Sequence, residues 1–74
     1  MKVKDMMSKG VVTVDESLSI REVAGVMARY DISGVAVVGK EGSLEGTISN
    51  RDIVEAIAEE KNIEKLRAGD LMIP

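Results

Sequence analysis

The spacing of apolar residues in the first half of the chain predicts a strand followed by a helix. Residues 11–14 read Val-Val-Thr-Val, a short β-branched run that is typical of a strand. Apolar residues then recur three and four positions apart, as on one face of a helix, at Ile20, Val23, Ala24 and Met27. We expect this helix to begin after a capping serine, Ser19, and to end near Asp31.

The second half of the chain predicts a hairpin and another helix. Residues 35–38 form a continuous apolar run, as in a strand that is buried on both faces. Glycines and charges at residues 39–43 indicate a turn, so residues 44–48 should return as a second strand. A helical apolar stripe follows at Ile53, Val54, Ile57 and Ala58. Asn62 is a candidate for a left-handed cap at the end of this helix.

The predicted order is therefore strand, helix, strand, strand, helix. Because a helix separates the first strand from the hairpin, a crossover connection is expected between them. This order predicts an α/β fold, a small β-α-β-β-α unit with a three-stranded sheet and helices packed on one face.

The two ends of the chain resemble each other. Asp-Met-Met at residues 5–7 is echoed by Asp-Leu-Met at residues 70–72. The chain either carries one repeat and the beginning of a second, or has two short amphipathic tails. We therefore divide it into a single motif, residues 1–62, and a segment, residues 63–74, that is a lead-in to a second motif or a C-terminal tail.

Composition excludes several classes of function. A chain of 74 residues without cysteine or histidine has no disulfide, no usual zinc ligand and no imidazole base. A domain of this size buries only about 60% of its unfolded surface, so we expect it to dimerise or to belong to something larger. Since no paired carboxylates face one another either, we see no catalytic constellation and expect no enzyme.

Net charge and hydropathy limit the kinds of partner and the location that we expect for this chain. The net charge of −3 argues against binding to a nucleic-acid backbone, and Tyr30 is the only aromatic residue that could stack on a base. No apolar run is long enough to span a membrane, and no signal-peptide pattern begins the chain. We expect a cytoplasmic protein.

Polar residues gather where the last predicted strand meets the last predicted helix, at Ser49, Asn50, Arg51 and Asp52. One interpretation is structural, because Ser49 at the N-cap and Asp52 three residues later form a variant of the capping box. The other is functional. A helix N-terminus favours a phosphate, which Arg51 could pair with and Ser49 could contact, while a carboxylate can accept hydrogen bonds from ribose hydroxyls. One carboxylate cannot fully serve both purposes, so the two interpretations compete.

The sequence resembles a known family at three places. The segments "DMMSKGVVTV", "SLSIREVAGVMARYDISGVAVV" and "GTISNRDI" stand in the order and spacing of a cystathionine β-synthase (CBS) motif. CBS motifs usually come in tandem pairs, so the resemblance implies a homodimer or a second motif in a parent chain. It also implies a regulatory module that requires no cofactor and binds an adenosyl ligand (AMP, ADP, ATP or S-adenosylmethionine) between paired motifs. The alternative is a dimerisation module without a ligand, in which Ser49 and Asp52 only cap a helix.

The resemblance also implies which residues bind the ligand. The family uses a Ser/Thr-x-x-Asp signature, matched by Ser49 and Asp52, with the aspartate on the ribose. Residues 32–34 match the segment that frames the adenine, and they are Ile32, Ser33 and Gly34. The lead into the first strand supplies further contacts, matched by Ser8, Lys9 and Val12.

The chain departs from the family at two positions. The family usually has a proline shortly after the glycine of this segment, and an aspartate after two further apolar residues. Ala36 and Gly39 stand at these positions here. The expected result is an intact strand with a less rigid entry, which affects the shape of the adenine wall.

Overall fold

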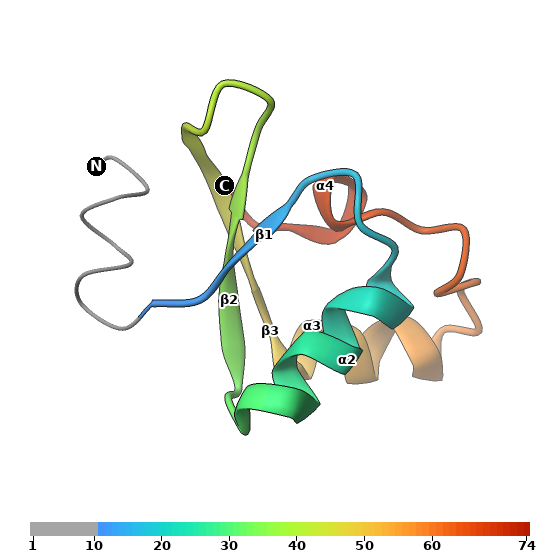
Figure 1. Cartoon of the computed structure of the whole chain (residues 1–74). Coiled ribbons are helices and arrows are strands. Elements are labelled where there is room, and N and C mark those ends of the chain that lie inside the picture. The colour runs from blue at the N-terminus through green and yellow to red at the C-terminus, as the bar shows by residue number, and fades with distance from the viewer. Residues whose placement is uncertain (1–10) are drawn as a thin grey trace.

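The fold follows the predicted order of elements. The structure, a computed structural model, describes residues 11–74 (Figure 1). Its elements are β1 (Thr13–Asp15), α2 (Ile20–Tyr30), β2 (Gly34–Val38), β3 (Leu44–Ser49), α3 (Asn50–Ala58) and the short α4 (Ala68–Leu71). The sequence did not predict α4.

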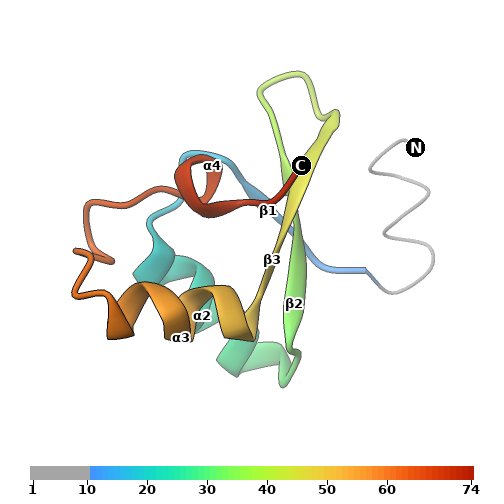
Figure 2. The same cartoon turned by 180° about the vertical axis from the view of Figure 1, so that it is seen from behind.

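The three strands form one mixed sheet in the order β1-β2-β3. β1 runs parallel to β2, with Thr13 opposite Ala36, and β3 returns antiparallel to β2, with Gly34 opposite Ser49. Both α2 and α3 lie on one side of the sheet, as the two opposite views show (Figures 1 and 2). The α/β class, the three-stranded sheet and the placement of the helices are thus confirmed.

The core lies between the sheet and the helices. Its largest fully buried side chains are those of Ile20, Val23, Val37 and Ile48. Successive residues of a strand point to opposite faces. Val35 and Val37 therefore face the helices, whereas Gly34 and Ala36 belong to the opposite, outer face of the sheet.

Helix α2 begins and ends as its sequence predicts. The Ser19 hydroxyl accepts a hydrogen bond from the backbone N–H of Glu22, and the Glu22 carboxylate accepts one from the backbone N–H of Ser19. This backbone bond, with a contribution from the Ser19 hydroxyl, lowers the pKa of Glu22 from its ordinary value. Asp31 ends the helix in the left-handed conformation, with φ 53°.

The prediction that Asn62 caps α3 was wrong. Glu60 takes the left-handed conformation instead, with φ 60°. The backbone N–H groups of Glu60 and Lys61 donate to the carbonyls of Ile57 and Ala56, at 3.0 Å each. These two bonds close a Schellman motif two residues before Asn62, so the last carbonyls of the helix are already satisfied. The Asn62 side chain instead accepts a hydrogen bond from the backbone of Glu64.

Residues 62–73, which we call the C-terminal arm, pack against the rest of the fold. The carbonyl of Leu18 accepts a hydrogen bond of 2.7 Å from the N–H of Ala68, whose side chain is completely buried. Farther along, Ile73 and Thr47 exchange two antiparallel backbone hydrogen bonds of 2.9 Å each. The arm therefore crosses the start of α2 and ends beside β3. Its role as a lead-in to a second motif stays a prediction.

Gly46 allows the arm to approach β3 closely. A Cβ atom at this position would lie 2.8 Å from the carbonyl oxygen of Ile73 and 3.1 Å from Cγ of Met72. The first distance is shorter than a van der Waals contact, and the atom it meets belongs to the backbone. Any larger residue at position 46 must displace the arm.

We predict that Gly46→Ala lowers the free energy of unfolding by about 1–3 kcal/mol, the usual cost of adding a methyl group where there is no room. Urea denaturation would measure the change. Gly25→Ala is the control, because a Cβ atom there meets nothing within 4 Å. In the middle of α2 this control should stabilise the fold by about 0.5–1 kcal/mol. If Gly46→Ala is as stable as the wild type, the arm does not lie against β3 in this way.

Candidate functional site

The hairpin brings the two predicted ligand-binding segments together at one end of the sheet. β2 begins at Gly34, which pairs with Ser49, the last residue of β3. The backbone N–H of Asn50 donates a hydrogen bond of 2.7 Å to the carbonyl of Ser33. Residues 32–34 therefore lie beside residues 49–52, as the resemblance requires.

Ser49 and Asp52 form a complete capping box at the start of α3. The Ser49 hydroxyl accepts a hydrogen bond from the backbone N–H of Asp52 at 3.2 Å. In return, the backbone N–H and the hydroxyl of Ser49 donate to Oδ2 of Asp52 at 2.7 Å and 2.9 Å. The structural interpretation of this pair is correct as far as the cap is concerned.

The cap uses only one carboxylate oxygen of Asp52. Both hydrogen bonds end on Oδ2, and no residue among 11–74 donates to Oδ1. A carboxylate can accept several hydrogen bonds, so Oδ1 remains available while Oδ2 holds the cap. The expectation that capping and ribose binding compete for this side chain is therefore too strict.

A small apolar pocket of about 280 Å³ opens on the outer face of the sheet. It is lined by Val11, Gly34, Val35, Ala36, Thr47, Ile48 and Ser49. Ala36 lies opposite Thr47 in the ladder, and Gly34 lies opposite Ser49, so all four belong to the face turned away from the helices. The pocket reaches the start of α3 at Ser49, where the cap holds Asp52.

Val11 and Thr47 are two of the pocket residues that were not predicted from the sequence. Val11 lines the pocket in place of the predicted Val12, whose carbonyl instead accepts a hydrogen bond of 3.1 Å from the N–H of Ala36. Thr47 is the other. The two-residue period of a strand could have found it, because Thr47 shares a face with Ser49. The predicted contacts Ser8 and Lys9 lie outside the residues that the structure describes.

The hydrogen bond from the N–H of Ala36 to the carbonyl of Val12 shows what alanine contributes at a position where the family usually has proline. The N–H of Ala36 belongs to the parallel ladder between β1 and β2. Proline has no N–H and could not make this bond. Alanine therefore ties β2 to the lead of β1 at the wall of the pocket.

Arg51 lies away from the pocket. Its Nε pairs with Oε1 of Glu55 at 2.9 Å, one turn farther along α3, and its side chain is 85% exposed. An exposed pair of this kind contributes little to stability, so the guanidinium could exchange it for a phosphate. A contact between Arg51 and a phosphate stays a prediction.

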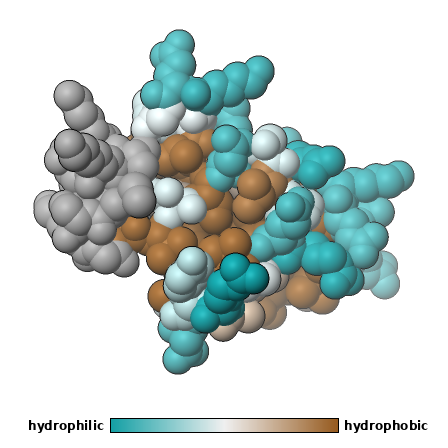
Figure 3. Space-filling model, viewed as in Figure 1, coloured by the Kyte–Doolittle hydropathy of each residue, from teal (hydrophilic) through white to brown (hydrophobic). Residues whose placement is uncertain are grey.

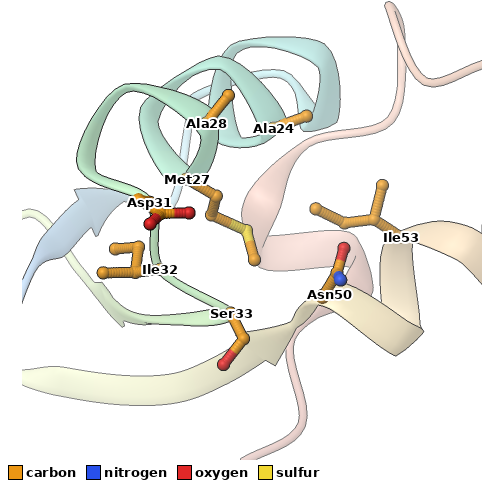
Figure 4. Close-up of a pocket in the computed structure, with 8 residues that line it drawn as sticks. All are labelled: Ala24, Met27, Ala28, Asp31, Ile32, Ser33, Asn50 and Ile53. Atoms are coloured by element: carbon orange, nitrogen blue, oxygen red, sulfur yellow. The ribbon is translucent and has the colours of Figure 1, made fainter.

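A second cavity, of about 430 Å³, lies on the helix side of the same sheet end (Figure 4). Ile32 and Ser33 contribute to it, together with Met27 and Asn50. Figure 4 shows the Met27 side chain extending from α2 toward the side of the cavity where Asn50 and Ile53 lie, while the Ser33 hydroxyl points away from α2. Of the three residues predicted to frame an adenine, Ile32 and Ser33 thus border this cavity, and Gly34 borders the outer pocket.

Two other kinds of site have no support in the part of the chain that the structure covers. Among residues 11–74, no group of three or more aspartate, glutamate, cysteine or histidine side chains could hold a metal ion. No helix in this region has the length and apolar character needed to cross a bilayer.

Comparison with known proteins identifies relatives over most of the chain. The model of the CBS domain family matches residues 3–59. The chain is 35% identical over 65 residues to the L-aspartate semialdehyde sulfurtransferase of Methanocaldococcus jannaschii, covering 86% of this chain and 13% of that protein. It therefore corresponds to a small part of this much longer relative.

Solved structures share the fold. A CBS-domain containing protein from Agrobacterium tumefaciens superimposes with a TM-score of 0.78 at 31% identity, over 96% of this chain and 56% of that one. A CBS domain protein from Pyrobaculum aerophilum complexed with AMP has a TM-score of 0.78 at 23% identity, over 84% and 48% of the two chains. The second likeness, at this low identity, concerns the fold alone.

We predict that Ser49→Ala lowers the free energy of unfolding by about 0.5–2 kcal/mol, because it removes the N-cap of α3. Chemical denaturation would measure the loss. Ser43→Ala serves as a control for the loss of an exposed serine hydroxyl, since within residues 11–74 this hydroxyl hydrogen-bonds only to the carboxylate of Glu45, near the start of β3. Equal stability of the two variants would show that the cap contributes nothing.

Proposed function

This chain belongs to the CBS domain family, and we propose that it is a regulatory module that binds an adenosyl ligand at the outer face of its sheet. The ligand class is AMP, ADP, ATP or S-adenosylmethionine. The observation that carries the proposal is an oxygen of Asp52, Oδ1, that accepts no hydrogen bond from residues 11–74, next to Ser49, which lines an apolar pocket. Binding would place the ribose at Asp52 and the base against Gly34 and Ala36.

The chemistry of the site suits the two halves of a nucleoside. A purine base needs apolar walls and a close approach to backbone, which the pocket offers at Gly34, Ala36 and Val11. Ribose hydroxyls need a hydrogen-bond acceptor, which Asp52 offers through Oδ1 without leaving the cap. The AMP complex of a CBS domain protein with the same fold supports this ligand class.

We further propose that the site is completed by a second motif, from another copy of this chain or from a parent chain. A pocket of about 280 Å³ lies at the lower limit of ligand sites, which typically enclose about 300–1,000 Å³. The apolar side chain of Val11 also remains exposed on the sheet side, at 38%. Figure 3 shows apolar surface gathered over the strands. A second motif placed there would cover this surface and deepen the pocket.

In this mechanism the ligand acts by selecting an arrangement of the paired motifs. A ligand that contacts both motifs binds more tightly to the arrangement in which both sets of contacts form, and so increases its population. The ligand shifts the equilibrium between the arrangements by the difference between its binding free energies for them, and an attached domain would respond to this shift.

A dimerisation module without a ligand is the second candidate. The complete capping box favours it, because the cap alone accounts for Ser49 and for one oxygen of Asp52. The two candidates differ at Oδ1, which has a function only if a ligand binds.

We predict that Asp52→Asn weakens AMP binding at least tenfold with only a small loss of stability. Asparagine keeps one oxygen for the cap but replaces the other with an amino group, which cannot accept hydrogen bonds from ribose. Hydrogen bonds to a charged group contribute about 1.5–3 kcal/mol, which corresponds to a tenfold or larger change in affinity. Amide NMR titrations with AMP, ATP and S-adenosylmethionine would measure the affinities.

Glu22→Gln is the matched control. Glu22 holds the equivalent capping box at the start of α2 and lines neither cavity. Its variant therefore loses a helix-terminal charge and should bind AMP as the wild type does. If the wild type shows no shift with any of the three ligands at millimolar concentration, the proposed ligand binding is wrong for this chain, and the module without a ligand is favoured. If Asp52→Asn binds as tightly as the wild type, Oδ1 does not hold the ligand.

A further inference from the structure

We propose that the C-terminal arm is a positioning element of the candidate nucleotide pocket, held there by the bridge between Ile73 and Thr47. This inference rests on the proposed nucleotide binding and adds a dependence on residues beyond the family match, which ends at residue 59. It assigns to Ile73 an effect on ligand affinity that acts through Thr47, without contact to the ligand.

The bridge fixes the backbone of a residue that lines the pocket. The N–H and the carbonyl of Thr47 both bond to Ile73 at 2.9 Å. Thr47 also lies opposite Ala36 in the β2–β3 ladder and lines the pocket. Thr47 therefore lies between β2 and the arm, and the arm takes up both of its backbone hydrogen-bonding groups.

Without the arm, β3 would be an edge strand at this point. Edge strands present unpaired N–H and carbonyl groups and are less restrained than strands with two neighbours. The arm covers the edge two residues before Ser49, the residue whose hydroxyl and backbone hold Asp52. Docking of the arm thus restrains both the wall of the pocket and the approach to the proposed ribose site.

The docking of the arm is specific at Gly46. The carbonyl oxygen of Ile73 occupies the space that a Cβ atom of residue 46 would need, at 2.8 Å. Leu71 and Met72 pack against the core cluster from the same segment. The arm therefore has one well-defined position, in which the Ile73 backbone reaches Thr47.

Thermodynamic linkage requires that docking of the arm and binding of the ligand affect each other equally. If a docked arm raises the affinity for the ligand by some factor, a bound ligand must stabilise the docked arm by the same factor. The expected factor is about two- to tenfold, which corresponds to the net contribution of one typical backbone hydrogen bond.

Ile73→Pro is the test variant. Proline lacks the N–H that Ile73 donates to Thr47. The preceding residue, Met72, has φ −57° and ψ 148°, the extended conformation that a residue before proline adopts, so the upstream chain needs no change. Ile73→Ala is the matched control, because it shortens a side chain that is 58% exposed and keeps both backbone bonds.

The experiment is an AMP titration of the wild type and of both variants in the full chain, monitored by amide NMR. Hydrogen exchange is measured with and without AMP at the Thr47 amide of all three proteins, and at the amide of residue 73 where it exists. We expect Ile73→Pro to bind AMP about two- to tenfold more weakly and Ile73→Ala to bind as the wild type does. We also expect saturating AMP to slow exchange of the Ile73 amide in the wild type by a similar factor.

Two results would overturn the inference and leave the proposed function standing. In the first, Ile73→Pro binds AMP as tightly as the wild type although exchange at Thr47 is faster, so the arm stabilises the fold without positioning the pocket. In the second, which needs no variant, AMP binds the wild type and leaves exchange at Ile73 unchanged. If the wild type does not bind AMP, ATP or S-adenosylmethionine, both the inference and the proposed function are wrong.

Discussion

The pairing of β2 with β3 is the constraint on which the rest of the structure depends. Its register places Gly34 opposite Ser49, so the entry to one strand lies beside the exit from the other. Because α3 begins directly after Ser49, the same register fixes where the helix starts. A slip of β3 by one residue would turn Ile48 out of the core and Thr47 into it. The buried aliphatic side chains therefore hold the candidate site in place indirectly, by disfavouring such a slip.

Several parts of the fold could be predicted because they follow from local patterns. The helical spacing of Ile20, Val23 and Met27 and the apolar run of β2 predicted their elements, and the Ser-x-x-acid pattern predicted both helix starts. The end of α3 could not be predicted from Asn62, because the Schellman motif closes around Glu60, a residue with no particular preference for the left-handed conformation. The arm was missed for a different reason. Its docking depends on Gly46, a contact between positions far apart in the chain.

The candidate site likewise has features that follow from local sequence and features that depend on contacts between distant residues. Sequence reasoning found the cap and its neighbours in residues 49–52, because capping is a local property. It did not find Val11, which joins the pocket only once the strands are paired, or Thr47, which the two-residue period of the strand could have indicated. It also treated Asp52 as a single acceptor, whereas the structure separates the two oxygens. One helix cap can in this way hold a carboxylate rigidly in place and still leave part of its capacity unused.

The docked arm also bears on how such units pass from one gene to another. The family match ends at residue 59, but Ala68 fills a buried position in the core and Ile73 completes the edge of β3. A duplication or recombination event that copied only the matched residues would transfer an unfinished fold, with the start of α2 and the edge of β3 uncovered. The inherited segment must extend past the residues that the family model matches. Selection on those further residues is therefore also selection on the folding of the domain before them.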